Sequence, residues 1–346
     1  VWQDRTDVEV GKGAEIIYRR PTGTTGELIG LSLAGLDING DSKADLAMTN
    51  IVFGGTSRVF VDFGETVTLM GTGISPIIRE MPTAADLTIN AGATGASELF
   101  GIPLANGGRL DGDSTDELLI GARKTQVAGQ TRGAVYVIKG DATATAAIDV
   151  ATSTRAIRIN GGSTNAAFGR SVAGVGDLNG DGVREFVVTD NERTVNGRAK
   201  AGTAYVFSLL PSAPATAADA KLVIENDRVG ADNDEFGISV ASSVRVSPDG
   251  ADLDKDTYAD LLIGMAQDGA TGGGAAKLFY GKTGALSGIA PQGVSSATAT
   301  LAPSGATASH SSVTLLVADT NGDTFADFIV TDFQFSASKG RVIVYD

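Results

Sequence analysis

Cysteine is absent from this chain of 346 residues, and histidine and tryptophan each occur once. These absences leave no Cys/His cluster of the kind that holds zinc. Neither a His-Glu-x-x-His helix nor a Gly-x-Ser-x-Gly nucleophile turn is present. Many exported bacterial proteins avoid cysteine and use bound metal for rigidity, so the absence favours export over the cytosol.

Positive charge and long apolar runs are also scarce. The formal net charge is −14, whereas a surface that binds phosphate backbones needs a basic stripe. No window reaches the roughly 18 consecutive apolar residues of a membrane-spanning helix. The first residues, Val1 to Asp4, lack the basic and apolar regions of a signal peptide, so we expect any such signal to be removed or to lie outside this sequence. Nucleic acid is excluded as a partner, and no membrane span is expected.

Glycine is abundant, with 46 residues, while aromatic residues make up only 6 % of the chain. This composition favours tight turns and small side chains near a crowded axis over long helices. Hydrophobic residues make up 42 %, which is enough for a core. All-β propellers of this length often form one domain, so residues 1–346 are expected to be a single domain.

One nine-residue pattern, Asp-x-[Asn/Asp]-x-Asp-x-x-x-[Asp/Glu], recurs along the chain. The starts of successive copies differ by 72, 68, 75 and 67 residues. A period of this length without a helical pattern between the copies predicts propeller blades. The five copies are 37–45, 109–117, 177–185, 252–260 and 319–327.

The segments around each copy predict strands. An apolar stretch follows every copy, an alternating strand and a fourth strand come next, and an inner strand precedes the copy. Four antiparallel strands per unit is the propeller blade count, and the count predicts an all-β propeller of five blades. The last unit lacks a fourth strand, so an N-terminal strand near 14–20 is expected to complete it and close the ring. Residues 62–84 lengthen the connection before the fourth strand of the first unit.

Three units begin with Phe-Gly, as in Phe168-Gly169, and the third strands begin with Gly-Ala-Val-Tyr at Gly133 or Gly-Thr-Ala-Tyr at Gly202. Together with the acidic loops, these motifs resemble the FG-GAP repeats of integrin α-chain propellers and related bacterial surface proteins. The resemblance runs from about residue 14 to 346. Known members have seven blades, so the prediction of five depends on the spacing alone.

The acidic loops have the ligand spacing that calcium requires. Calcium takes six to eight oxygen ligands, and in the EF-hand positions 1, 3 and 5 supply side chains and position 7 a backbone carbonyl. The resemblance implies that the acid at position 9 is also a ligand. The candidate ligands are Asp37, Asn39, Asp41, Lys43 and Asp45; Asp111, Asp113, Thr115 and Glu117; Asp177, Asn179, Asp181, Val183 and Glu185; Asp252, Asp254, Asp256, Tyr258 and Asp260; and Asp319, Asn321, Asp323, Phe325 and Asp327.

Two loops depart from the pattern. Arg109 stands where the second loop should have its first Asp, and its cation could neutralise the carboxylates in place of a metal ion. Lys255 replaces the glycine that bends the other loops at position 4. We therefore expect four to five Ca²⁺ ions, and five would bring the formal net charge from −14 to −4.

These observations favour a calcium-binding module for adhesion or for protein or glycan interaction in an exported surface protein. Its partner would be a protein, a glycan or a neighbouring domain, and its calcium would be structural. The alternatives are a carbohydrate-active enzyme similar to a polysaccharide lyase, and a purely structural spacer, because fold does not decide function. An enzyme is disfavoured because the clustered acids are taken up by metal. The lone His310 falls where Phe-Gly begins other inner strands, and its role is left open.

Overall fold

The protein is almost entirely β-structure in the computed structural model. The helices of the described residues are two short 3-10 turns, η2 (Ala217–Asp219) and η4 (Val294–Ser296). None of these helices has the length and hydropathy needed to cross a membrane. The residues described are 16–21, 26–53, 55–64, 77–92, 98–143, 147–164, 166–208, 210–211, 215–229, 232–241, 251–267, 274–286, 292–301, 311–318, 320–321, 326–332 and 341–345.

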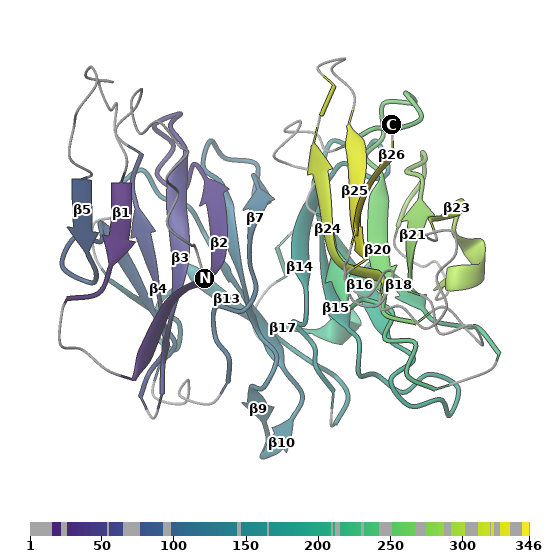
Figure 1. The fold of residues 1–346 in the computed structure, drawn as a ribbon, viewed down its shortest axis with the longest axis horizontal. Helices are drawn as coiled ribbons and strands as arrows, with labels where there is room; N and C mark the ends of the chain where they lie inside the picture. The colour runs from purple at the N-terminus through teal and green to yellow at the C-terminus, as the bar shows by residue number, and fades with distance from the viewer. Residues whose placement is uncertain are drawn as a thin grey trace.

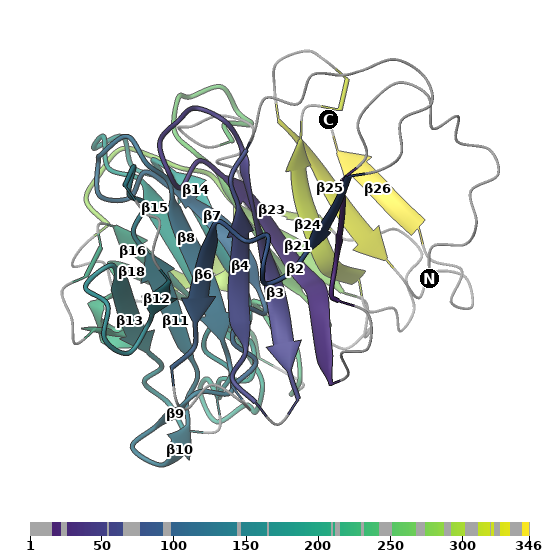
Figure 2. The ribbon, with the colours of Figure 1, turned by 90° about the vertical axis from the view of Figure 1, so that its left-hand side faces the viewer.

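Five small antiparallel sheets follow one another around a common axis and form the blades of a propeller (Figures 1 and 2). From the inside outward, blade 1 contains β2 (Glu27–Leu36), β3 (Asp45–Val52), β4 (Arg58–Asp62) and β6 (Leu87–Asn90). Blade 2 contains β7 (Leu104–Gly108), β8 (Glu117–Ala122), β11 (Ala134–Ile138) and β13 (Ala156–Asn160). Blade 3 contains β14 (Val172–Gly176), β15 (Glu185–Asp190), β16 (Thr203–Ser208) and β18 (Leu222–Glu225). Blade 4 contains β19 (Ser239–Val240), β20 (Leu261–Met265), β21 (Ala275–Phe279) and β23 (Ala299–Leu301), and blade 5 contains β24 (Ser311–Ala318), β25 (Asp327–Asp332) and β26 (Arg341–Tyr345).

The predicted five-bladed, all-β propeller is confirmed, and the outer edges of three blades carry an addition that the sequence did not predict. A two-residue strand from the following unit pairs in parallel with the outermost strand. It ties each of these blades to the next unit of the chain. These strands are β12 (Ile148–Asp149) on blade 1, β17 (Ala215–Thr216) on blade 2 and β22 (Gln292–Gly293) on blade 3. A separate hairpin of β9 (Gln126–Val127) and β10 (Gln130–Thr131) projects from blade 2.

Apolar side chains on facing sheets hold consecutive blades together. The second and third strands of a blade are buried on both faces, so their residues alternate between two neighbouring interfaces. Four clusters of buried side chains result, one at each junction from blade 1 to blade 5. Representative pairs are Val59 with Ile120, Val137 with Phe186, Val187 with Ile263 and Leu278 with Val330.

The Phe-Gly and Gly-Ala motifs meet at the blade junctions. Phe168 of blade 3 forms a β-bridge with Gly133 at the start of the third strand of blade 2, and Phe236 of blade 4 does the same with Gly202 of blade 3. A Cβ atom at Gly133 or Gly202 would overlap the backbone of the facing phenylalanine. The ring of Phe168 also packs edge-on against Tyr205, with centroids 5.4 Å apart. The two motifs are therefore the two sides of one contact between neighbouring blades.

The N-terminal strand does not close the ring, which corrects the expectation for residues near 14–20. Residues 14 and 15 lie outside the described part, and β1 (Ile16–Arg19) pairs in parallel with β5 (Ile77–Glu80), from the insertion at 62–84. The hydroxyl of Tyr18 donates to Oδ2 of Asp62 at 2.6 Å, and Arg19 and Glu80 form an ion pair. The insertion therefore supplies the partner strand of β1 in place of the edge of blade 5.

In a closed propeller, blade 5 and blade 1 would face each other. The β1–β5 pair covers this face of blade 1, and the face of blade 5 that would meet it carries exposed side chains. Tyr18 packs with Met48 and Phe60 of blade 1 and with Met81, which follows β5, on the side of blade 1 away from blade 2 (Figure 1). Val342 and Val344 of blade 5 stand at the register positions of Val59 and Val61. The blade 1 residues are fully buried, whereas Val342 is 65 % and Val344 is 50 % exposed.

Candidate metal centres

The acidic loops join the inner strand to the second strand of each blade, so they gather on one side of the propeller. This position follows from the topology, because the loop always leaves the same end of the inner strand. The first four loops are described in full. In the fifth, Asn321 and Asp327 are described, while Asp319, Asp323 and Phe325 lie outside the described residues.

The last acid of every loop is buried and closes the loop by the same hydrogen bond. One of its carboxylate oxygens accepts from the backbone N–H of the second loop residue, at 2.5 to 2.9 Å. The acid therefore belongs to the loop and to the buried second strand at once. The pairs are Asp45 with Ile38, Glu117 with Leu110, Glu185 with Leu178, Asp260 with Leu253 and Asp327 with Thr320.

The other acids fold the loop around themselves. In the third loop, Asp177 accepts from the N–H groups of Gly180 and Gly182, at 2.7 and 2.9 Å. Asp181 accepts from the N–H of Val183 at 2.9 Å. These turns point the carboxylates inward, as a loop that wraps a cation requires. In the fourth loop Lys255 adopts φ 66°, the left-handed conformation expected of the glycine it replaces.

Backbone hydrogen bonds link the loops of neighbouring blades. The N–H of Asp116 in the second loop donates to the carbonyl of Asp37 in the first, and the N–H of Ala259 donates to the carbonyl of Asp177, both at 2.8 Å. Asp116 also accepts from the backbone N–H of Asp37 through its carboxylate, at 3.0 Å. The repeat pattern does not predict a role for Asp116, because only one loop has an acid at position 8. An ion that stiffens one loop would therefore also stiffen its neighbour.

The second and fourth loops bring three carboxylates together. One oxygen each of Asp111, Asp113 and Glu117 lies within 4.8 Å of the others, and the same holds for Asp252, Asp254 and Asp260. Like charges at this spacing repel by about 3 kcal/mol per pair at an effective dielectric constant of about 20. Among the described residues, the acids of the first and third loops do not form such a group of three. The acids of the second and fourth loops are thus close enough together to share one divalent cation.

The loops that end in Glu differ from those that end in Asp. The second oxygen of Asp45 accepts from the N–H of Gly64, and that of Asp260 from the N–H of Gly281. Oε1 of Glu117 and Oε1 of Glu185 are instead buried without a hydrogen bond of good geometry, although the N–H of Gly140 and the hydroxyl of Ser208 are near enough to lower the pKa of these two acids. A buried carboxylate oxygen without a partner is costly, and a metal ion is one way to satisfy it.

Burial sets the protonation of these acids in the absence of metal. It raises the pKa of Glu117 from 4.5 to about 8, with the charge of Asp111 as the next cause. Burial likewise raises the pKa of Glu185 to about 7 and that of Asp260 to about 6. A bound cation would reverse these shifts, because metal ligands must be deprotonated.

The cation beside the second loop is not the one that the sequence suggested. Arg109 is exposed and forms no ion pair with any described residue. Nζ of Lys139, at the end of the third strand of blade 2, lies 3.2 Å from Oδ2 of Asp111. Lys139 is thus the cation that neutralises part of the charge of this loop. Nothing in the loop sequence identifies it, since it is distant in the chain.

The comparisons with known proteins agree with this architecture. The FG-GAP repeat family model matches residues 168–207, which run from the Phe-Gly bridge through the third acidic loop to the third strand of blade 3. No curated protein matches the chain. The repeat suggests a protein-interaction module. The chain is therefore a five-bladed β-propeller that carries the FG-GAP repeat.

Proposed function

We propose that the chain is a calcium-stabilised interaction module for adhesion, and part of an exported surface protein. The observation that carries the proposal is the buried last acid of each loop, which reaches from the strand into the acidic loop. Oxygen ligands at this spacing suit calcium better than zinc or copper, which prefer nitrogen and sulfur. FG-GAP repeats commonly bind calcium and occur in extracellular or surface proteins, where millimolar calcium fills weak sites.

Calcium in this proposal acts on the fold and not on a substrate. Each ion would tie an inner strand to the second strand of its blade and, through the links between loops, to the next blade. A ligand that binds only the folded state stabilises it by about 2.7 kcal/mol when present at 100 times its Kd. Four to five such sites would make the rigid propeller depend on calcium, while the partner is bound by surfaces outside the loops.

The test of calcium binding is ion stoichiometry and melting temperature, with Glu117→Gln as the variant. Gln keeps an oxygen for the N–H of Leu110 and places its NH₂ at the unpaired Oε1, so the loop remains folded. We expect chelation to lower the melting temperature of the parent, and the variant to bind one ion fewer. The matched control Asp141→Asn changes an exposed acid outside the loops and should leave the stoichiometry unchanged. A melting temperature that chelation does not move contradicts the calcium proposal.

The interaction role has its own experiment. The calcium-loaded chain is screened on glycan and extracellular-protein arrays, and binding that requires the folded propeller supports the adhesion proposal. The same preparation is incubated with a polysaccharide panel, for which we expect no release of reducing ends or unsaturated sugars. Release of either product would replace the proposal with the carbohydrate-active enzyme.

A further inference from the structure

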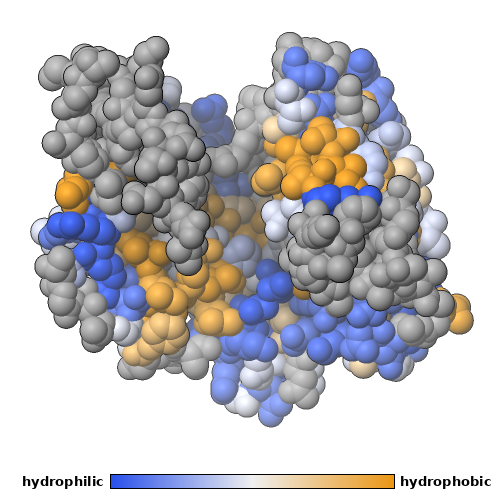
Figure 3. All heavy atoms as spheres, in the orientation of Figure 1, coloured by the Kyte–Doolittle hydropathy of each residue, from blue (hydrophilic) through white to orange (hydrophobic). Residues whose placement is uncertain are grey.

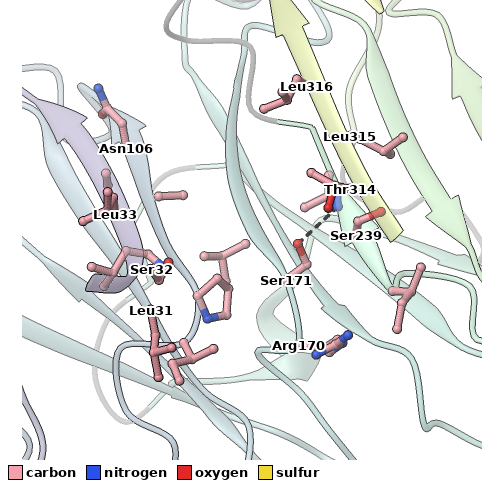
Figure 4. A pocket seen from close by; sticks show the side chains of 18 of the residues that line it. Leu31, Ser32, Leu33, Asn106, Arg170, Ser171, Ser239, Thr314, Leu315 and Leu316 are labelled. Carbon is pink, nitrogen blue, oxygen red and sulfur yellow. Dashed lines mark hydrogen bonds between the residues drawn. The ribbon is translucent and has the colours of Figure 1, made fainter. Parts of the chain in front are cut away.

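The inner strands of the five blades line an open cavity of about 450 Å³ on the propeller axis. Its walls are Leu31–Gly35 of β2, Ile102–Asn106 before and within β7, Arg170–Val172 at β14, Ile238–Val240 at β19 and Thr314–Val317 of β24. Figure 4 shows these side chains converging on the cavity from separate strands. The volume is within the range of small-molecule sites.

The wall of the cavity exposes polar and apolar surface in nearly equal amounts, and three leucines supply part of the apolar share. Leu31, Leu33 and Leu316 line it and are 54 %, 56 % and 54 % exposed. Figure 3 shows apolar surface on both sides of the central hollow. Large apolar side chains gathered around a hollow mark a surface that gains from being covered.

The polar groups of the wall are largely engaged with protein. Oγ of Ser32 accepts from the N–H of Leu104 at 2.9 Å, and Oγ of Ser171 accepts from the N–H of Val240 at 3.1 Å. These bonds hold neighbouring inner strands together. These two hydroxyls are therefore less available to the hydroxyl groups of a sugar, which favours a ligand that contacts the leucines.

Arg170 is the one charged residue among those that line the cavity. Leu31, Ile102 and Ile238 occupy its position in blades 1, 2 and 4, so a guanidinium takes the place of an aliphatic side chain. Its side chain has no hydrogen bond or ion pair with any described residue, and its Nε is buried without a partner. Figure 4 shows the guanidinium at the wall of the cavity.

The surroundings of Arg170 leave its charge poorly compensated. Burial is the main cause that lowers its pKa, and the neighbouring Arg123 lowers it further. Glu235 and Glu192 act in the opposite sense, but neither forms an ion pair with Arg170. An anion that enters the cavity would meet a guanidinium that forms no ion pair with the part of the chain that the structure describes.

We propose that the axial cavity binds an apolar chain that ends in a carboxylate. Arg170 would hold the carboxylate through its guanidinium, and Leu31, Leu33 and Leu316 would cover the chain. A carboxylate matches the fork of an arginine with two parallel hydrogen bonds. A fatty acid and the C-terminus of an apolar peptide share this chemistry.

The site is separate from the proposed calcium centres. Arg170 precedes β14, whereas the acidic loop at 177–185 follows it, so the two lie at opposite ends of the same strand. Loss of calcium binding in the Glu117→Gln variant should leave the cavity ligand bound. Failure of either proposal is thus distinguishable from failure of the other.

The test is calorimetric titration of the calcium-loaded chain, freed of excess calcium, with decanoate, hexanoate and decan-1-ol. We expect saturable binding of decanoate at one site. Each buried methylene contributes about fourfold in affinity, so hexanoate, which has four methylenes fewer, should bind up to about 250-fold more weakly. Decan-1-ol lacks the charge and should bind at least tenfold more weakly than decanoate. Equal binding of the alcohol and the acid would overturn the proposal.

Two variants locate the site. Arg170→Met keeps the apolar bulk and removes the charge, and should weaken decanoate binding at least tenfold while the melting temperature stays near that of the parent. Arg158→Met removes an arginine from the outer strand β13, away from the cavity, and should bind decanoate as the parent does. An unchanged affinity in Arg170→Met contradicts the assignment. A tri-leucine peptide is also titrated, once as the free acid and once as the amide. Tighter binding of the free acid than of both the amide and decanoate identifies a peptide C-terminus as the source of the carboxylate.

Discussion

Gly202 allows the most direct test of how the blades are joined. It stands at the junction of blades 3 and 4 with φ +93°, bridged to Phe236. Its N–H donates to the carbonyl of Arg193 and its carbonyl accepts from the N–H of Asn226, both at 3.1 Å. In Gly202→Ala the new Cβ would overlap the carbonyl of Phe236, which is backbone and cannot rotate away.

The expected cost has two parts. A non-glycine residue in the left-handed conformation costs about 1–2 kcal/mol. Overpacking at a closely packed contact adds about 1–3 kcal/mol, because the bridge must lengthen and the two blades must separate slightly. Gly202→Ala should therefore lower the free energy of unfolding by about 2–5 kcal/mol.

Gly129→Ala separates the two parts. Gly129 has φ +74° in the β9–β10 hairpin, and a Cβ there would meet nothing within 4 Å. It should cost the conformational part alone, about 1–2 kcal/mol. The assay is urea unfolding of both variants and the parent at one calcium concentration. Equal losses in the two variants would refute the account of the Phe-Gly bridge as a close interblade contact.

Two further predictions concern the acidic loops and the N-terminal strand. The pKa of Glu117 is about 8 in the folded protein and 4.5 ordinarily. In the calcium-depleted protein this difference stabilises the folded state fully below pH 4.5, and the stabilisation is lost as the pH rises to about 8. The melting temperature of calcium-depleted protein should fall over this range while the increase caused by calcium grows, and the opposite trends would contradict the buried position of Glu117. Tyr18→Phe removes the hydrogen bond to Asp62 and should cost about 1–3 kcal/mol in urea unfolding; no loss would mean that β1 does not pack on blade 1.

The sequence predicts the blades well because their signals are local. The period of the acidic loops and the alternation around Val135 or Val206 depend on neighbouring residues, and the strands form where expected. The pairing of β1 could not be predicted in this way. Ile77–Glu80 lies in an insertion without a counterpart in other units, and its advantage over blade 5 comes from long-range contacts such as that between Tyr18 and Asp62.

The candidate site shows the same division between local and distant information. The ligand positions within each loop follow from spacing, since each loop closes on itself. The distances between the carboxylates within a loop also depend on groups that are distant in the chain. Lys139 beside Asp111 and Gly64 beside Asp45 are examples. Arg170 shows a related limit, because its lack of a partner becomes visible only once the five inner strands surround it.

The uncovered face of blade 5 affects how the molecule holds together. In a closed ring every blade has two neighbours, whereas here the buried clusters at the junctions form a linear series from blade 1 to blade 5. The β1–β5 pair acts as a cap on the first unit, whereas no described segment caps the last unit, on which Val342 and Val344 are exposed. Stability in such an array is the sum of nearest-neighbour terms. Loosening would therefore start at blade 5 and reach the central blades, each held on both faces, last.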